Sequence, residues 1–216
     1  MPKITIKEIN KRRLNARYAK PWGKCDAGVL LVPSAFGFGP GVDQQLTALA
    51  EAGLAALAWN PYSAYDPAIS REERTRLADT VLQDNDCLRE QSSWLDYMYS
   101  TLKLSKVGAL GFCMGGRMAM LLAAADDRVK AVSAFYPTMR DPRPANANDL
   151  PAVAAQIRCP VQVHYPGKDH LTSYASMQRL RNELDKRTAV TPASVIVYPQ
   201  GTHGFLGKTK EASPSD

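Results

Sequence analysis

A cysteine lies between glycines in Gly-Phe-Cys-Met-Gly, residues 111–115, directly after an apolar run and directly before a helix-like stretch. This spacing matches a nucleophile elbow, with Cys113 at the position of the nucleophile. In such an elbow the nucleophile is exposed at a helix N-terminus, and the helix end lowers the pKa of a thiol. Nucleophilic chemistry also needs a base, an orienting acid and an oxyanion site. The alternative interpretation of Cys113 is a buried structural cysteine beside a glycine-rich turn.

Asp169 and His203 are the candidates for the acid and the base. Asp169 lies in Tyr-Pro-Gly-Lys-Asp-His-Leu, and His203 lies in Pro-Gln-Gly-Thr-His-Gly-Phe-Leu, each straight after an apolar run. The chain order of nucleophile, acid and base is that of the α/β-hydrolase fold. We expect Asp169 to hold the His203 imidazole in the productive tautomer. His203 would take the thiol proton and return it to a leaving group.

The other two histidines are assigned no chemistry. His164 lies inside an expected strand, which favours a hydrogen-bonded structural group, and His170 is expected to be a loop residue whose side chain points away from Asp169. No histidine or cysteine spacing is that of metal ligands, so no metal site is expected. The glycine-rich residues 37–41 do not have the spacing of a phosphate-binding loop. We interpret this segment as part of the loop after the strand 27–33 that supplies one oxyanion N–H, from about Ala35, and we expect the other N–H from Met114, directly after Cys113.

Six apolar, β-rich runs alternate with helix-like stretches along the chain. The runs cover residues 27–33, 53–59, 106–112, 129–136, 159–167 and 193–199. The helix candidates cover residues 43–52, 71–84, 86–102, 114–125, 150–157 and 172–188. Near-continuous hydrophobic strands are buried on both faces, and their alternation with helices predicts parallel βαβ units.

The fold class predicted is therefore α/β, with the α/β-hydrolase fold and a mostly parallel, doubly wound sheet. Residues 3–18 are expected to add an antiparallel hairpin at one edge, with its turn near Asn10 and Lys11. In this architecture binding sites form at the carboxyl ends of the strands. Residues 136–144 are interpreted as a loop over those strand ends rather than as a domain boundary.

Charge and composition exclude several classes of function. The net charge is +6, and residues 1–24 hold eight Lys or Arg and one acidic residue. We interpret these cations as protection of an exposed edge strand, so no nucleic-acid partner is expected. No signal peptide and no membrane-spanning stretch is expected. The four cysteines show no pairing pattern, which predicts reduced thiols and a cytoplasmic location.

Three motifs together resemble those of the dienelactone hydrolase family of α/β-hydrolases. They are Gly-Phe-Cys-Met-Gly-Gly, Gly-Lys-Asp-His and Gly-Thr-His-Gly-Phe, and the similarity covers about residues 25–206. The resemblance implies one domain, residues 1–216, that hydrolyses an ester or lactone and needs no cofactor. By motif matching, the nucleophile, acid and base are Cys113, Asp169 and His203. The oxyanion loop corresponds to Pro-Ser-Ala-Phe-Gly, residues 33–37.

The sequence departs from the family pattern in three places. Ser34 stands where the family enzyme has a glutamate beside the resting thiol, and we expect Ser34 to donate a hydrogen bond to a thiolate instead. Gly207 stands at a common arginine position that helps to bind a substrate carboxylate. A second family arginine falls near residues 71–76, where Arg74 is the candidate. The C-terminal covering helix of the family has no evident counterpart after His203.

Two functions remain open at the level of the sequence. The first is a thiol hydrolase of an ester or lactone, with an anionic substrate as one option. The second is a catalytically silent α/β-hydrolase scaffold that binds a small molecule or a protein. Substrate contacts are expected from Ser34, Phe36, Tyr136 and Arg74, because small-ligand pockets are commonly lined by aromatic side chains with a few polar groups. The substrate itself and the oligomeric state are left open.

Overall fold

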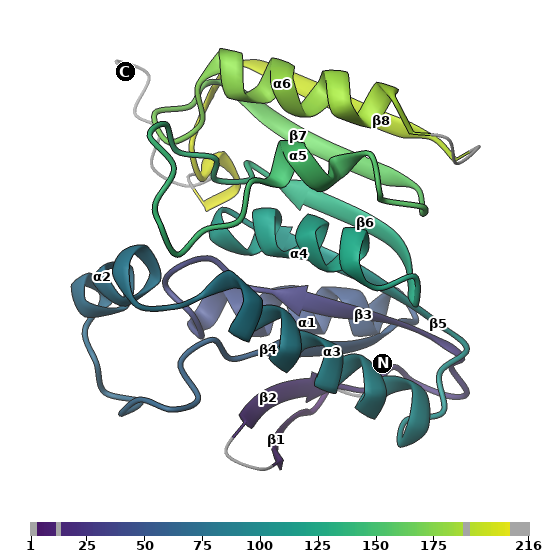
Figure 1. The fold of residues 1–216 in the computed structure, drawn as a ribbon. Coiled ribbons are helices and arrows are strands. Elements are labelled where there is room, and N and C mark those ends of the chain that lie inside the picture. The colour runs from purple at the N-terminus through teal and green to yellow at the C-terminus, as the bar shows by residue number, and fades with distance from the viewer. Residues whose placement is uncertain (1–3, 12–13, 188–190, 208–216) are drawn as a thin grey trace.

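Within residues 4–11, 14–187 and 191–207, which are those that the computed structural model describes, eight strands form one sheet (Figure 1). Their order across the sheet is β1-β2-β4-β3-β5-β6-β7-β8. Their bounds are β1 (Ile6–Lys11), β2 (Leu14–Ala19), β3 (Ala27–Val32), β4 (Ala55–Trp59), β5 (Lys106–Phe112), β6 (Val129–Phe135), β7 (Val161–Lys168) and β8 (Ala193–Thr202). The two strands at one edge, β1 and β2, are antiparallel to their neighbours, and the remaining strands are parallel.

The predicted α/β-hydrolase arrangement is confirmed by this topology. All six apolar runs became strands, and β3 to β6 are buried between layers because their residues are small or branched and apolar. The expected edge hairpin is present as β1 and β2. Asn10 pairs with Asn15 and Lys11 with Leu14, so both Asn10 and Lys11 belong to β1, and the turn expected near them lies outside the described residues.

Helices cover both faces of the sheet. They are α1 (Pro40–Glu51), α2 (Arg71–Thr80), α3 (Asp84–Ser100), α4 (Met114–Ala125), α5 (Leu150–Ala154) and α6 (Tyr174–Asp185), and a short 3-10 turn, η1, follows at Phe205–Gly207. In Figure 1, α1 lies behind the sheet, and α3, α4, α5 and α6 lie in front of it. Helix α2 ends at Thr80, before the predicted residue 84, and the Asn146 side chain donates to the carbonyl of Ala78 in its last turn and to that of Leu82 just beyond it.

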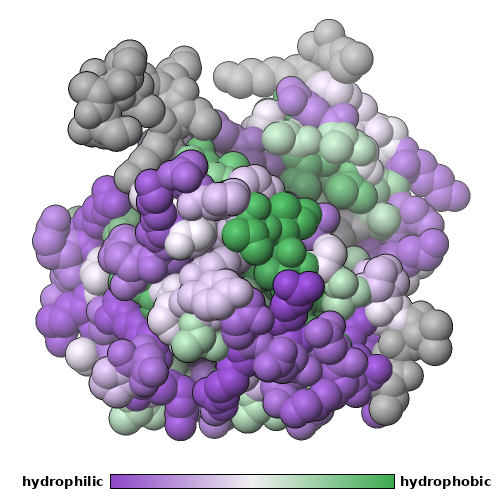
Figure 2. Space-filling model, turned by 90° about the horizontal axis from the view of Figure 1, so that it is seen from above, coloured by the Kyte–Doolittle hydropathy of each residue, from purple (hydrophilic) through white to green (hydrophobic). Residues whose placement is uncertain are grey.

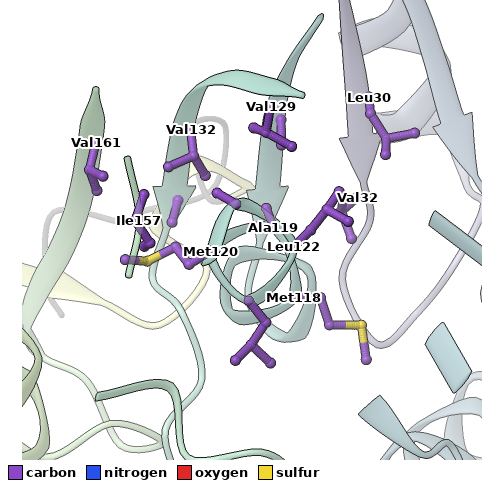
Figure 3. Close-up of a cluster of buried hydrophobic side chains, with 14 of the residues drawn as sticks. Leu30, Val32, Met118, Ala119, Met120, Leu122, Val129, Val132, Ile157 and Val161 are labelled. Carbon is purple, nitrogen blue, oxygen red and sulfur yellow. The ribbon is translucent and has the colours of Figure 1, made fainter. Parts of the chain in front are cut away.

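Helix α4 occupies the centre of the core. Figure 3 shows Met118, Ala119, Met120 and Leu122 of this helix among side chains from β3, β6 and β7. Ten consecutive residues of α4, Met114 to Ala123, are buried. A helix that is apolar on every side is a buried helix. Its N-terminus, at Cys113, is consequently held rigidly at the carboxyl end of β5.

The surface carries hydrophobic groups at one end of the sheet. Figure 2 looks down on the β8 and α6 end of the molecule, where a hydrophobic patch is surrounded by hydrophilic residues. Ile196 and Val197 of the edge strand β8 are exposed. Among the described helices, none has both the length and the apolar character needed to cross a bilayer.

Candidate active site

Cys113 lies on the sharp turn between β5 and α4, as the elbow pattern predicts. Its backbone angles are φ 58° and ψ −122°, a backbone conformation that residues other than glycine rarely adopt. A Cβ on Gly111 would lie 2.0 Å from the carbonyl oxygen of Gly115, and a Cβ on Gly115 would lie 2.1 Å from that of Val32. Only glycine fits at both positions, because the turn at Cys113 brings the start of α4 into backbone contact with the ends of β5 and β3.

His203 and Asp169 meet at the neighbouring strand ends. Asp169 follows β7, His203 follows β8, and His203 Nδ1 lies 2.9 Å from Asp169 Oδ2 and 3.0 Å from Oδ1. The Asp169 carboxylate is fully buried, and its Oδ1 also accepts from the amides of Leu171 and Thr172. A carboxylate that only accepts requires Nδ1 to carry a proton. Nε2 of His203 is buried and has no hydrogen-bond partner of standard geometry among the described residues, and its interaction is with Cys113, whose pKa it lowers.

The negative charge of a Cys113 thiolate and the positive charge of a His203 imidazolium stabilise each other. Burial by itself raises the pKa of the Cys113 thiol, but the hydrogen bond and the charge of His203, the Thr138 hydroxyl and the Met114 amide together bring that pKa below its usual value. Burial disfavours the imidazolium, yet Asp169 and Cys113 raise the pKa of His203 to about 9. A depressed thiol pKa beside a raised imidazole pKa favours the thiolate–imidazolium pair.

Thr138 is a contact of the sulfur that the sequence analysis missed. Its Oγ1 lies 3.2 Å from Cys113 Sγ. The structure shows no hydrogen bond from Ser34 to Cys113 among the described residues; the Ser34 hydroxyl instead accepts from the amide of Phe36 in its own loop. Thr138 comes three residues after the end of β6. The rule that sites form at the carboxyl ends of strands could therefore have pointed to it.

The two expected oxyanion donors border the same pocket as Cys113. Ala35 and Met114 both line it, and neither of their amides is bonded to a backbone carbonyl in the described part of the chain. The Ala35 peptide is fixed by Tyr62, whose hydroxyl lies 2.5 Å from the Ala35 carbonyl oxygen. The Met114 amide already interacts with the sulfur. Backbone amides placed beside a thiol in this way can stabilise the oxyanion of a tetrahedral intermediate.

The pocket beside Cys113 has a volume of about 220 Å³. Residues 138–151, between β6 and α5, form much of its wall, together with the first turns of α4 and α6. Its lining combines small apolar side chains with several arginines and aspartates. The charged members are Asp79, Arg117, Arg140, Asp141, Arg143, Asp149 and Arg179. The site is thus sized for a small molecule and carries charges of both signs.

Comparison with known proteins gives the family. The match to the Dienelactone hydrolase family spans residues 14–215. The chain belongs to the dienelactone hydrolase family. A relative from Escherichia coli K12, named "Putative carboxymethylenebutenolidase", is 33% identical over 96 residues, which are 44% of this chain and 35% of that protein. A Bradyrhizobium relative, named "Probable 2-oxo-3-(5-oxofuran-2-ylidene)propanoate lactonase", is 28% identical over 149 residues, 65% of this chain and 58% of its own length.

The fold is also that of the family. A crystal structure named as a "Putative Dienelactone Hydrolase" from Klebsiella pneumoniae superposes with a TM-score of 0.79 at 21% identity, over 99% of this chain and 93% of that one. The match to the E. coli relative spans about a third of that protein's length. Fold and family membership therefore follow from these comparisons.

The arginines that reach the pocket differ from those expected for this family member. Arg74 donates to the carbonyls of Phe36, Phe38 and Pro67, so it holds the loop after β3, and it is not among the residues that line the pocket. Arg140 is paired with Asp79 at 2.9 Å, and Arg179 with Asp149 at 2.7 Å. Arg143 donates to the carbonyl of Ala147 and has no carboxylate partner within the described residues. Its charge is consequently the least compensated of these three.

The other expected substrate contacts also lie outside the pocket lining. Phe36 is exposed, and the Arg71 guanidinium lies 3.7 Å from the centre of its ring. Tyr136 is buried with its ring centre 5.1 Å from that of His203, so it packs against the base. Ser34 faces its own loop. These three positions and Arg74 therefore support the loop and the imidazole, and none of the four reaches the described pocket.

The remaining histidines, His164 and His170, differ in their surroundings. His164 is structural, as predicted: its Nδ1 lies 2.8 Å from the Tyr198 hydroxyl and its Nε2 lies 3.0 Å from Gln162 Oε1. His170 is exposed, but its ring stands edge-on to His203 with centres 5.6 Å apart. The His170 side chain therefore lies beside His203.

Proposed function

We propose that this protein hydrolyses small carboxylic esters or lactones through a covalent intermediate on Cys113. The observation that carries the proposal is the juxtaposition of a depressed-pKa thiol, a buried imidazole that interacts with it and is bonded to a buried carboxylate, and the Ala35 and Met114 backbone amides at the pocket that Cys113 lines. These are the parts that acyl transfer requires. Family membership supports the same reaction class.

In the first half of the reaction the Cys113 thiolate attacks the carbonyl carbon. A carbon–sulfur bond forms, and the carbonyl electron pair moves onto oxygen, where the Ala35 and Met114 amides hold the negative charge. Collapse of the tetrahedral intermediate breaks the bond to the leaving oxygen. That oxygen takes a proton from His203 Nε2, which leaves the imidazole neutral. For a lactone the leaving oxygen stays attached to the acyl chain.

In the second half a water molecule resolves the thioester. Neutral His203 takes a proton from the water as it attacks the thioester carbonyl, and the same amides hold the second oxyanion. Collapse releases the carboxylic acid and the Cys113 thiolate, so the thiolate–imidazolium pair is restored. Asp169 stabilises the imidazolium at both stages and keeps Nδ1 protonated.

Arg143 is the lining arginine that can meet an anionic group on the substrate. Among the arginines that line the pocket, Arg143 has no carboxylate partner within the described residues, so its guanidinium can pair with a carboxylate of a ligand. Arg140 and Arg179 are neutralised by Asp79 and Asp149. We propose Arg143 as the residue that favours acidic esters and lactones over neutral ones.

The test is turnover of p-nitrophenyl acetate and of a five-membered enol lactone by wild type and by Cys113→Ala. We expect Cys113→Ala to lose on the order of 10³-fold or more in kcat/KM. Cys25→Ala is the matched control, because the Cys25 thiol contacts the carbonyls of Ala27 and Gly53 at the other end of the sheet. Equal rates for wild type and Cys113→Ala would reject the hydrolase and favour the silent binding scaffold.

A further inference from the structure

The Thr138 hydroxyl approaches the nucleophile from the pocket side. Oγ1 is 3.2 Å from Cys113 Sγ, and the Thr138 amide donates to the Cys113 carbonyl at 3.2 Å. A thiolate can only accept a hydrogen bond, so the hydroxyl must be the donor whenever the sulfur is ionised. Hydrogen bonds to an ionised acceptor are about twice as strong as neutral ones.

Thr138 is held in this position by Thr172. The Thr172 hydroxyl donates to the Pro137 carbonyl at 2.8 Å and accepts from the Met139 amide at 2.8 Å, so it fixes the peptides on both sides of Thr138. Thr172 is buried, and its own amide donates to Asp169 Oδ1 at 3.1 Å. The segment that carries the hydroxyl is therefore tied to the loop that carries the acid. A donor held in place before reaction costs no reorganisation when charge appears.

The other ionisable groups near Cys113 do not replace the Thr138 hydroxyl as a neutral hydrogen-bond donor to the sulfur. His203 approaches from the turn after β8 and carries the positive charge. Burial raises the pKa values of the Tyr136 hydroxyl, after β6, and of the Tyr62 hydroxyl, after β4, so both stay neutral. Arg117, one turn along α4, is paired with the buried Asp84.

We propose that Thr138 is a catalytic residue whose hydroxyl donates to Cys113 Sγ and keeps the nucleophile ionised before a substrate binds. Once the sulfur is acylated it becomes a weak acceptor, and the hydroxyl is released toward the pocket. The β-branched side chain suits this task because its χ1 rotamers are restricted. The inference deepens the proposed function, since it takes Cys113 as the nucleophile, but the ionisation of Cys113 is measurable without any substrate.

The experiment measures the rate at which iodoacetamide alkylates Cys113 between pH 4 and pH 10, with peptide mass spectrometry to separate Cys113 from the other thiols. Thr138→Val removes the hydroxyl and keeps the shape, whereas Thr138→Ser keeps the hydroxyl. We expect Thr138→Val to move the midpoint up by about one pH unit, which is about tenfold less alkylation below the midpoint. Thr138→Ser should stay closer to wild type.

Thr138→Ala is measured beside Thr138→Val, and the absorbance of the thiolate near 240 nm gives a second readout in each folded variant. The proposal is overturned if the valine and alanine variants alkylate like wild type at every pH, or if they lose turnover with an unmoved midpoint. A moved midpoint in a protein that hydrolyses no ester would keep Thr138 as the donor and reject the proposed function instead.

Discussion

Asp169→Asn tests how the acid sets the state of His203. The Asn side chain can still accept from the Leu171 and Thr172 amides through its Oδ1, so the loop after β7 should keep its shape. The other side-chain atom then becomes an NH₂ group that faces His203 Nδ1. A donor there requires Nδ1 to accept, which moves the proton of the neutral imidazole to Nε2. In that tautomer His203 cannot take a proton from the thiol or from water.

The size of the effect follows from the charge environment. The pKa of His203 rises from its usual 6.5 to about 9, chiefly through Asp169 and then through Cys113, against burial. A rise of about 2.5 in pKa corresponds to roughly 3 kcal/mol, shared between the two partners. Loss of the Asp169 share lowers the imidazolium population, and the inverted tautomer removes the base. Together we expect a decrease in kcat/KM of about 10² to 10⁴.

The assay is kcat/KM for p-nitrophenyl acetate between pH 5 and pH 10. In wild type, activity needs the thiolate and the protonated imidazole, so it should rise as pH passes the lowered pKa of Cys113 and fall as pH passes about 9. Asp169→Asn should bring the alkaline fall to lower pH, because its imidazolium loses the proton sooner. Asp127→Asn, which alters an exposed pair with Arg158, is the control.

An unchanged kcat/KM, or an alkaline limb that stays near pH 9 in Asp169→Asn, would refute this reasoning. Asp169 would then be a structural residue of the loop, and another group would have to orient the imidazole. A circular dichroism melt within a few degrees of wild type is needed beside the kinetics, because a misfolded loop would also lower activity.

Two further predictions concern the elbow and the pocket. Gly115→Ala would place a Cβ 2.1 Å from the Val32 carbonyl oxygen, so we expect at least about 3 kcal/mol of destabilisation and a Tm lower by roughly 10 °C. Gly41→Ala, with open space around it on α1, should melt within about 3 °C of wild type, and equal melts for both variants would contradict the close approach. Arg143→Leu should raise KM for an acidic lactone about fivefold, an effect of about 1 kcal/mol, and leave KM for p-nitrophenyl acetate unchanged. A parallel rise for both substrates would remove Arg143 from substrate selection.

The sequence by itself determined the order of the helices and strands, and it pointed to the three residues whose side chains could carry out the chemistry. Near-continuous apolar runs can only be buried strands, and helix-like stretches between them force parallel connections, so the sheet followed from local composition. The elbow could also be predicted from local sequence, because Gly111 and Gly115 flank Cys113 within five residues and both positions require glycine. Asp169 and His203 could be found because each follows a buried strand, and parallel strands bring their carboxyl ends to one edge.

Only the tertiary structure decided which polar groups surround the sulfur and the pocket. Ser34 and Thr138 are both hydroxyl residues in loops at strand ends, and nothing in the local sequence says which one faces Cys113. The choice depends on Thr172, which holds the peptides around Thr138 from a position 34 residues further along the chain. Arg74 was likewise expected to contact the substrate, but in the structure it donates to the carbonyls of Phe36 and Phe38 in the loop after β3. Such contacts arise where loops from distant parts of the chain meet, and the spacing of residues within any one loop does not encode them.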